Sequence, residues 1–275
     1  MSMSPGQSEK AIGFRALHEL PEPFVIPNPW DAASARMLAS LGFKALATSS
    51  AAAAWVLGRR DGAITREEAL ANAKLIVEAT TLPVSADLEN GYADDPATVA
   101  ETICMAAEIG LAGGSIEDST RQDTHSIYNM THAAERVAAA AEAARALPFP
   151  FVLTARAENF VRGRKDLDDT IRRLQAYEKA GADVLFAPGL PDIRAIRAVC
   201  AAISKPVNVM AAVAGPGFSI RELSEAGVRR ISTGGALYRA ALNGAFEACR
   251  EIQQSGTFGF ANRVLSSAQM AGFLR

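Results

Sequence analysis

The chain has 275 residues, of which 49% are hydrophobic, and this is enough for one large buried core. Its formal net charge of −2 gives no sign of the clustered basic surface that nucleic acids or anionic membranes require. Three widely spaced cysteines argue against a zinc site or a disulfide framework. With no apolar run of membrane-spanning length and a polar N-terminus, we expect a soluble, cytoplasmic protein.

Short β-type runs alternate with helical stretches along almost the whole chain. Glycine ends several of the helical stretches, as is typical of helix C-termini. The predicted strands are 24–26, 44–48, 83–87, 114–117, 151–155, 183–187, 206–210 and 230–233. The predicted helices are 29–41, 65–80, 96–110, 132–147, 166–180, 192–203, 219–226 and 235–254.

Eight strand–helix pairs of this kind predict an α/β protein, a closed (β/α)8 TIM barrel with parallel strands inside and helices outside. An open doubly wound sheet is the alternative. The segment Pro27-Asn-Pro-Trp30 follows the first strand and contains no glycine-rich dinucleotide fingerprint, which weakens that alternative. We expect residues 1–275 to form one domain, with an added N-terminal helix at 10–20.

The segment from Phe258 onward does not follow the strand–helix alternation, and we expect it to form a C-terminal helical extension. It contains the apolar stretch 270–274. A helix that packs on its own barrel or on a neighbouring subunit would bury this apolar face.

Acidic side chains gather where three successive predicted strands end. The third strand ends at Asp87, with Glu89 two residues further on, and the fourth ends at Glu117. The fifth leads to Arg156 and Glu158. Asp87 and Glu89 point the same way if the strand continues. In a barrel these strand ends meet at one mouth, where active sites lie.

Carboxylates that are packed together repel one another unless a cation or a proton lies between them. A hard divalent cation with oxygen ligands resolves this conflict, and Mg²⁺ fits best, with Mn²⁺ as a substitute. No histidine lies at these strand ends, which disfavours zinc and iron.

Several polar residues are candidates for contact with a substrate at the same mouth. The planar fork of Arg156 would hold a carboxylate, although a structural ion pair is the alternative. Ser49 and Ser50 have small side chains that let a ligand approach the backbone N–H groups. Tyr92 and Asn208 are further candidates for lining the site.

At these residues the sequence resembles the isocitrate lyase/phosphoenolpyruvate mutase superfamily, over about residues 27–235. The similar motifs are Pro27-Asn-Pro-Trp-Asp31, Gly58-Arg-Arg-Asp61, Asp87-Leu-Glu-Asn-Gly-Tyr92, Ser115-Ile-Glu-Asp118 and Thr154-Ala-Arg156. The resemblance implies a barrel in which Asp87 holds Mg²⁺ directly. It implies further ligands that act through water, namely Asp61, Glu89 and Glu117.

The resemblance also implies how a substrate is held and how the chain assembles. Arg156 and the loop at Ser49, Ser50 and Ala51 would hold a 2-oxo acid or its enolate, with Asp61 beside it. Superfamily members form homotetramers that often exchange a C-terminal helix, and the segment from Phe258 is a candidate for that role.

The loop after the fourth strand departs from the superfamily pattern. Lyases of the superfamily carry Lys-Lys-Cys-Gly-His there, with the cysteine as acid/base. In this chain the loop reads Asp118-Ser-Thr-Arg-Gln-Asp-Thr-His-Ser126, without cysteine, and has Ser119 where mutases and phosphonopyruvate hydrolases have lysine. His125 is the best proton carrier there by its unperturbed pKa, with Asp123 and Tyr128 as the other candidates.

We therefore predict a 2-methylisocitrate lyase-like, Mg²⁺-dependent enzyme that cleaves a carbon–carbon bond in a small 2-oxo or 2-hydroxy di- or tricarboxylate. The reaction would pass through a metal-stabilised enolate. The expected catalytic residues are Arg156, His125 and Tyr92, with Asn208 beside the substrate. The alternatives are an oxaloacetate-type hydrolase or decarboxylase, and a non-catalytic binder of 2-oxo acids.

Overall fold

Eight parallel strands form one sheet that curls into a barrel in the computed structural model, which describes residues 5–120, 126–212 and 217–274. The strands are β1 (Phe24–Ile26), β2 (Leu46–Ala47), β3 (Val84–Asp87), β4 (Gly113–Glu117), β5 (Val152–Arg156), β6 (Val184–Phe186), β7 (Val207–Met210) and β8 (Arg230–Ser232). Their order is β1-β8-β7-β6-β5-β4-β3-β2. The backbone N–H of Ala47 donates to the carbonyl of Pro27 at 3.1 Å and so bridges the gap between β2 and β1. The predicted (β/α)8 barrel is confirmed.

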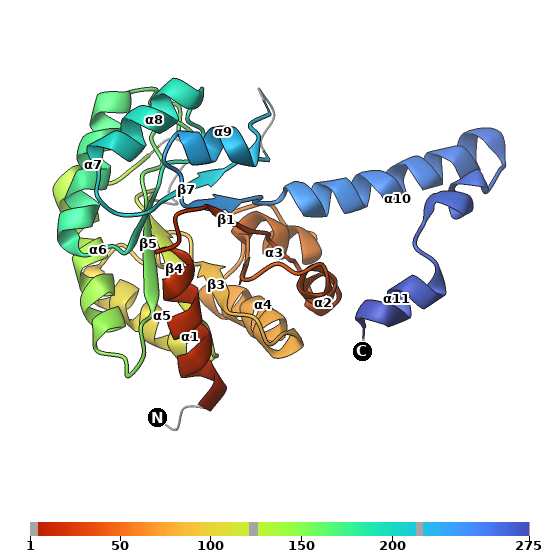
Figure 1. Cartoon of the computed structure of the whole chain (residues 1–275), viewed down its shortest axis with the longest axis horizontal. Coiled ribbons are helices and arrows are strands. Elements are labelled where there is room, and N and C mark those ends of the chain that lie inside the picture. Colours follow the sequence, from red (N-terminus) through yellow and green to blue (C-terminus); the bar gives the residue numbers. More distant parts are fainter. Residues whose placement is uncertain (1–4, 121–125, 213–216, 275) are drawn as a thin grey trace.

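Helices α2 to α9 surround the sheet, whereas α10 extends away from it (Figure 1). They are α2 (Ala32–Ser40), α3 (Ser50–Val56), α4 (Arg66–Ala79), α5 (Pro96–Glu108), α6 (Met130–Arg145), α7 (Leu167–Ala180), α8 (Ile193–Ala202), α9 (Ile220–Glu225) and α10 (Ala236–Ser255). The helix predicted from residue 29 begins later, because Asp31 and Ser34 form a capping box at its N-terminus. Helix α3 was not predicted, and Ser49, interpreted as part of a loop, is its N-cap.

The N-terminal helix α1 (Pro5–Leu17) lies against the amino ends of the strands. It begins and ends earlier than the predicted 10–20. Phe14 is fully buried and packs edge-on against Phe24 at the start of β1. His18, one residue beyond α1, lies 3.5 Å from the guanidinium of Arg230 at the start of β8. This end of the barrel is therefore closed, and an interior site opens toward the other end.

Polar side chains occupy interior positions that branched apolar residues fill in most TIM barrels. Buried examples on the strands are Ser85, Thr154, Asn208, Arg230 and Ser232. Arg230 reaches from β8 to Thr154 on β5, which is not a neighbouring strand, and donates to its hydroxyl at 2.9 Å. The middle of the barrel is thus a hydrogen-bonded layer rather than an apolar core.

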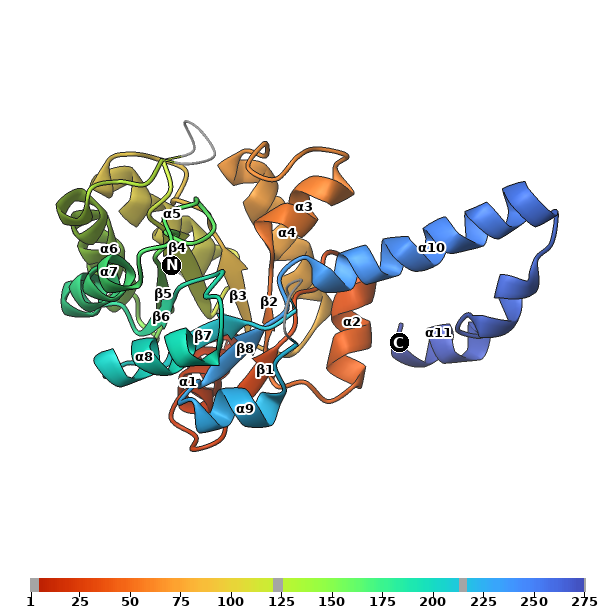
Figure 2. The same cartoon turned by 90° about the horizontal axis from the view of Figure 1, so that it is seen from above.

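The C-terminal extension is helical, as expected, and projects away from the barrel (Figures 1 and 2). It consists of α10, the 3-10 helix η1 (Gly259–Arg263) and α11 (Ser267–Phe273), and none of their described residues is buried. Arg36 of α2 donates to the carbonyl of Leu274 at 2.9 Å, so the end of the chain returns to the barrel. None of the described helices is both long and apolar enough to cross a membrane.

We predict that His18 makes the fold less stable as the pH falls. Burial, helped by the charge of Arg230, lowers the pKa of His18 to about 3. An unfolded histidine has a pKa of about 6.5, so the unfolded state binds one more proton between these values. Stability from this group is complete above about pH 6.5 and falls below it, by up to about 1.4 kcal/mol per pH unit.

Urea unfolding at several pH values measures this effect. The variant His18→Gln should show a flatter loss of stability between about pH 6.5 and pH 4 than the parent, because glutamine does not titrate. His132→Gln controls for the loss of a half-exposed surface histidine. Equal slopes for the parent and His18→Gln would contradict the prediction.

Candidate active site

A cavity of about 590 Å³ opens among the carboxyl ends of the strands. Most of the residues that the sequence predicts for the site line this cavity: Ser49, Ser50, Ala51, Asp61, Asp87, Glu89, Glu117, Arg156 and Asn208. Tyr92 is not among the lining residues, and His125 lies outside the described residues. The sequence thus identified most of one wall of the cavity.

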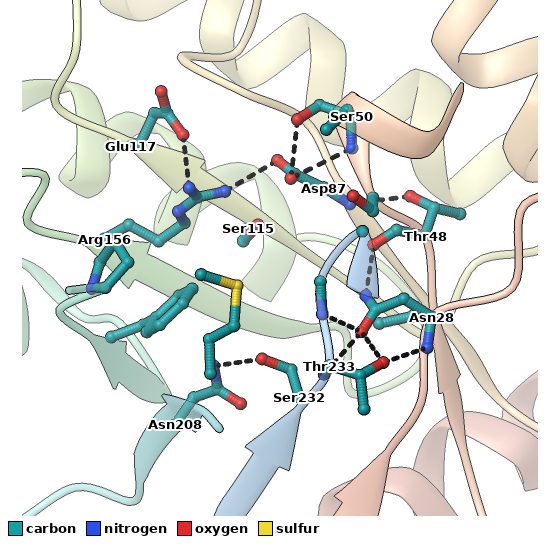
Figure 3. Close-up of a pocket in the computed structure, with 18 of the residues that line it drawn as sticks. Asn28, Thr48, Ser50, Asp87, Ser115, Glu117, Arg156, Asn208, Ser232 and Thr233 are labelled. Atoms are coloured by element: carbon teal, nitrogen blue, oxygen red, sulfur yellow. Dashed lines mark hydrogen bonds and ion pairs between the residues drawn. The ribbon is translucent and has the colours of Figure 1, made fainter. Parts of the chain in front are cut away.

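Arg156, the last residue of β5, joins carboxylates from neighbouring strands (Figure 3). Its guanidinium donates to Asp87 at 2.9 Å and lies 3.0 Å from Glu117 and 2.9 Å from Glu158. All four side chains are largely withdrawn from solvent, with Arg156 14% and Asp87 16% exposed. These ion pairs raise the pKa of Arg156 against the effect of its burial, so the guanidinium stays charged. Without a ligand, Arg156 forms the ion pairs that the sequence left as the alternative.

Asp87 at the end of β3 accepts hydrogen bonds on both carboxylate oxygens. Oδ2 accepts from the backbone N–H and the hydroxyl of Ser50 at 3.2 and 3.0 Å. Oδ1 accepts from the N–H of Glu89 at 3.1 Å, in addition to Arg156. Because Ser50 opens α3 beside Ser49, the carboxylate ties this loop to the strand end.

β3 ends at Asp87, so the condition under which Asp87 and Glu89 would point the same way, a strand that continues to Glu89, is not met. Glu89 and Tyr92 both have positive φ values, 47° and 61°, which is costly for residues with a Cβ. Glu89 is buried, and its carbonyl accepts from the N–H of Glu117 at 2.8 Å. It reaches the cavity through this turn and not through strand alternation. Tyr92 lies behind it, with its hydroxyl 3.4 Å from the Glu89 carboxylate.

Asp61 lies at the exposed rim of the cavity, in the loop after α3. The surrounding protein removes enough water from its carboxyl group to raise the pKa, and the charges of Asp87 and Glu117 raise it further. Asp61 therefore lies where the negative charges of Asp87 and Glu117 oppose its ionisation.

Glu158 and Arg162 extend the charged cluster beyond the predicted residues. Glu158 was noted as a strand-end acid but was given no role, and Arg162 was missed. Arg162 donates to Glu117 at 3.2 Å. Burial raises the pKa of Glu158 to about 8, and the charge of Arg156 offsets this only in part. Glu158 is thus an acid that can exchange a proton near neutral pH.

Asn28 was also missed, because an asparagine between two prolines gives no periodic signal. Its side chain oxygen accepts from the backbone N–H groups of Thr233 and Gly234 at 3.0 and 2.9 Å. Its side chain nitrogen donates to the carbonyl of Thr48 at 2.8 Å. Asn28 therefore fixes the loops after β1, β2 and β8 relative to one another (Figure 3).

Tyr128, one of the candidate proton carriers, has its hydroxyl hydrogen-bonded to Asp94 and Asn90, and it does not line the cavity. Burial, with the Asp94 contact, raises its pKa above the ordinary value. Nearby Asp118 accepts from Arg173 and Tyr177 at 2.9 and 2.6 Å and is buried. Neither residue is among those that line the cavity.

The oxygen donors at the mouth fit a hard divalent cation. Within the described ranges, no three acidic, histidine or cysteine side chains are grouped closely enough to hold an ion together. The resemblance implies a cation that one carboxylate holds directly and the others through water, and this ligand set stays a prediction. Asp87, the expected direct ligand, lies between the loop of Ser50 and Arg156.

The fold and the acidic mouth define an enzyme-like (β/α)8 barrel. Residues 14–253 match the family model described as phosphoenolpyruvate phosphomutase, and the chain belongs to this family, within the phosphoenolpyruvate mutase/isocitrate lyase superfamily. An uncharacterised Mycobacterium tuberculosis protein is 33% identical over 88% of this chain and 89% of its own length. Oxaloacetate decarboxylase 2 of Pseudomonas fluorescens is 31% identical over 84% of this chain and 79% of its own.

Solved structures agree with this assignment. A candidate lyase/mutase from Burkholderia cenocepacia has a TM-score of 0.96 and 52% identity, and the match covers 98% of this chain and 97% of that one. A 2,3-dimethylmalate lyase of the superfamily has a TM-score of 0.86 and 28% identity, and the match covers 99% and 95%. Proteins this similar to the chain thus carry names of different reactions on small carboxylates.

We predict that Asp87→Ala abolishes Mg²⁺ binding, because it removes the carboxylate expected to coordinate the ion directly. Glu89→Ala should weaken binding less, since a ligand that acts through water is easier to replace. Both variants should remain folded, because residues at a barrel mouth contribute little to the core. Calorimetric titration with Mg²⁺ measures the affinity. If the Asp87→Ala variant binds Mg²⁺ with the affinity of the parent, the assignment of the metal site is wrong.

Proposed function

We propose that this protein is a Mg²⁺-dependent lyase that cleaves a carbon–carbon bond in a small 2-oxo or 2-hydroxy di- or tricarboxylate. The observation that carries the proposal is the convergence of Asp87, Glu117 and Arg156, from three neighbouring strands, in one cavity. The two carboxylates offer oxygen ligands for a metal cation. The guanidinium of Arg156 offers a positive charge to an oxygen of the substrate. Superfamily members are lyases, decarboxylases and hydrolases of small carboxylates and typically depend on Mg²⁺.

The chain's own residues would bind and orient the acid. Arg156 would donate from its fork to the carboxylate or to the oxygen that becomes negative when the carbon–carbon bond breaks. The backbone N–H groups around Ser49, Ser50 and Ala51 would hold the carboxylate end. Asp87, Glu89, Glu117 and Asp61 would hold Mg²⁺, which when bound supplies Lewis-acid stabilisation of the developing charge.

Cleavage of a 2-hydroxy acid also needs a group that removes the hydroxyl proton, and one that returns a proton to the enolate. We assign this work first to His125, on sequence grounds. Glu158 is the described cavity residue with a suitable pKa, about 8. It also touches Arg156, so its proton would respond to a charge beside that guanidinium.

Decarboxylation of an oxaloacetate-type acid is the second candidate reaction. The Pseudomonas fluorescens relative named oxaloacetate decarboxylase supports it, and release of CO₂ needs no base on the loop after β4. A third reading, a binder without turnover, keeps the cation and Arg156 but lacks a proton carrier.

A panel of 2-oxo and 2-hydroxy di- and tricarboxylates, assayed with Mg²⁺, distinguishes these functions. A lyase releases a carbonyl product, such as a 2-oxo acid, together with a carboxylic acid. A hydrolase consumes water and releases two carboxylic acids from a 2-oxo acid, whereas a decarboxylase releases CO₂. Product detection by NMR identifies which bond breaks. Release of CO₂ alone would replace the lyase proposal by the decarboxylase, and binding without any product would leave the binder.

We predict that Arg156→Lys lowers the affinity for a 2-oxo dicarboxylate by about tenfold or more, because lysine keeps the charge but loses the bidentate fork. Isothermal titration in the presence of Mg²⁺ measures this. The exposed Arg239, which also lines the cavity, provides the matched control Arg239→Lys. An unchanged dissociation constant for Arg156→Lys would limit Arg156 to its ion pairs.

We predict that His125→Gln lowers kcat by about 100-fold while ligand binding stays nearly intact, if the loop carries the proton. Glu158→Gln is the matched comparison, because it removes the other candidate group. Steady-state kinetics on the substrate that the panel identifies, with calorimetric binding, separates the two. A fully active His125→Gln combined with an inactive Glu158→Gln would transfer the role to Glu158.

A further inference from the structure

Arg230 is a buried cation that lines the cavity and has no carboxylate partner among the described residues. It is 5% exposed. Its guanidinium donates to the side chain oxygen of Asn208 at 3.0 Å and to the hydroxyl of Thr154 at 2.9 Å, and lies 3.5 Å from His18. His18 remains neutral at pH 7, because its pKa is lowered to about 3. All three partners are therefore uncharged.

A buried charge without a countercharge is costly, and proteins usually pair it. Two other arginines that are largely withdrawn from solvent follow this rule, Arg156 and Arg173. Arg156 contacts Asp87, and Arg173 contacts Asp118 and Asp169, each at 2.9 Å. Arg136, which does not line the cavity, donates to backbone carbonyl oxygens. Arg230 is thus the buried, cavity-lining arginine whose charge the described residues leave uncompensated.

The guanidinium of Arg230 also keeps donors for a ligand. A guanidinium has five N–H groups, and three are directed to Asn208, Thr154 and His18. That leaves about two N–H groups for another acceptor. Burial lowers the pKa of Arg230 only to about 9, so the group stays charged at neutral pH.

Arg230 is the first residue of β8, so it lies deeper in the barrel than the proposed cation site at the carboxyl ends of the strands, and it lines the same cavity. Its partner Thr154 precedes Arg156 by two residues on β5, so the two side chains share a face about 6.6 Å apart along the strand. Three serines with small hydroxyl side chains also line the cavity: Ser85, Ser115 and Ser232. They leave room that valine or leucine would fill. Figure 3 shows Asn208 and Ser232 at this level, away from Asp87 and Ser50.

We propose that Arg230 binds a second carboxylate of the substrate at the floor of the cavity, while the first lies beside Arg156 and the metal. The inference rests on the proposed function, because it assumes that a small acid occupies this cavity. A carboxylate would supply the missing countercharge and accept the remaining N–H groups of the fork. Arg230 would then select dicarboxylates over monocarboxylates.

The test compares malate with 2-hydroxybutyrate, which has the same chain and 2-hydroxy acid group but a methyl group in place of the second carboxylate. Isothermal titration at saturating Mg²⁺ and fixed ionic strength gives both affinities. The parent should bind malate about tenfold or more tightly than 2-hydroxybutyrate. In Arg230→Met this ratio should fall below about threefold, with the affinity for 2-hydroxybutyrate retained.

Thr154→Val serves as the control, because it removes one neutral partner of Arg230 and keeps the charge, so the ratio should stay near that of the parent. Thermal unfolding reports whether each variant folds. If Arg230→Met does not fold, Arg230→Lys decides, since it keeps the charge but loses the fork. A threefold or larger loss of malate affinity alone, about 0.65 kcal/mol, supports the proposal, whereas equal loss for both acids overturns it.

Two further results would overturn the proposal. One is a parent ratio near one. The other is tighter binding of 2-hydroxy-3-phosphonopropanoate than of malate, which would assign the floor to a tetrahedral anion. Failure of the proposed function looks different, because absent turnover on every acid leaves the malate ratio measurable. Loss of both ligands in Asp87→Ala would locate the acids in this cavity even then.

Discussion

The repulsion between carboxylates at the ends of neighbouring strands is the constraint on which the cavity mouth depends. β3 and β4 both end in an acid, and these acids stay together because Arg156 at the end of β5 contacts both. Parallel pairing sets Glu117 directly beside Arg156 in register, so the ion pair follows from the order of the strands. The further donors to Asp87, from Ser50 and the N–H of Glu89, share the same negative charge.

The rest of the barrel holds this charged mouth in place at some cost to ordinary core packing. The interior of the strands carries hydroxyl, amide and guanidinium groups instead of branched apolar side chains, and each needs a hydrogen-bond partner. Asn208 illustrates the arrangement, since it donates to Ser232 and accepts from Arg230. The side chain of Asn28 likewise connects the loops, and it adds to the backbone hydrogen bond of Ala47 with Pro27 that joins β2 to β1. A polar, rigid interior of this kind suits a cavity for a charged ligand.

Much of the fold was predictable, because local patterns of apolar, polar and capping residues indicate most of the strands and helices. Alternation of short apolar runs with capped helices gave all eight strands to within a few residues, and strand count and order implied the barrel. The acids Asp87 and Glu117 were found the same way, since in a barrel the end of a strand is also a position in the site. The predicted start of a helix was wrong where a capping residue sets it, as at Asp31. Helix α3 was not predicted, because Ser49 and the alanine run after it have no periodic pattern of apolar and polar residues.

The sequence by itself determined the barrel and pointed to the acids of its mouth, because these depend on local periodicity and on strand ends. Only the tertiary structure decided how side chains from distant strands meet. Glu89 enters the cavity through a left-handed turn, and the hydrogen bond of its carbonyl with the N–H of Glu117 stabilises that turn. The Asn90-Gly91 pair is typical of a turn, but it does not predict the direction of the Glu89 side chain. Arg230 and Thr154 lie 76 positions apart and on strands that do not pair. The neutral surroundings of the Arg230 guanidinium therefore form only when the barrel closes.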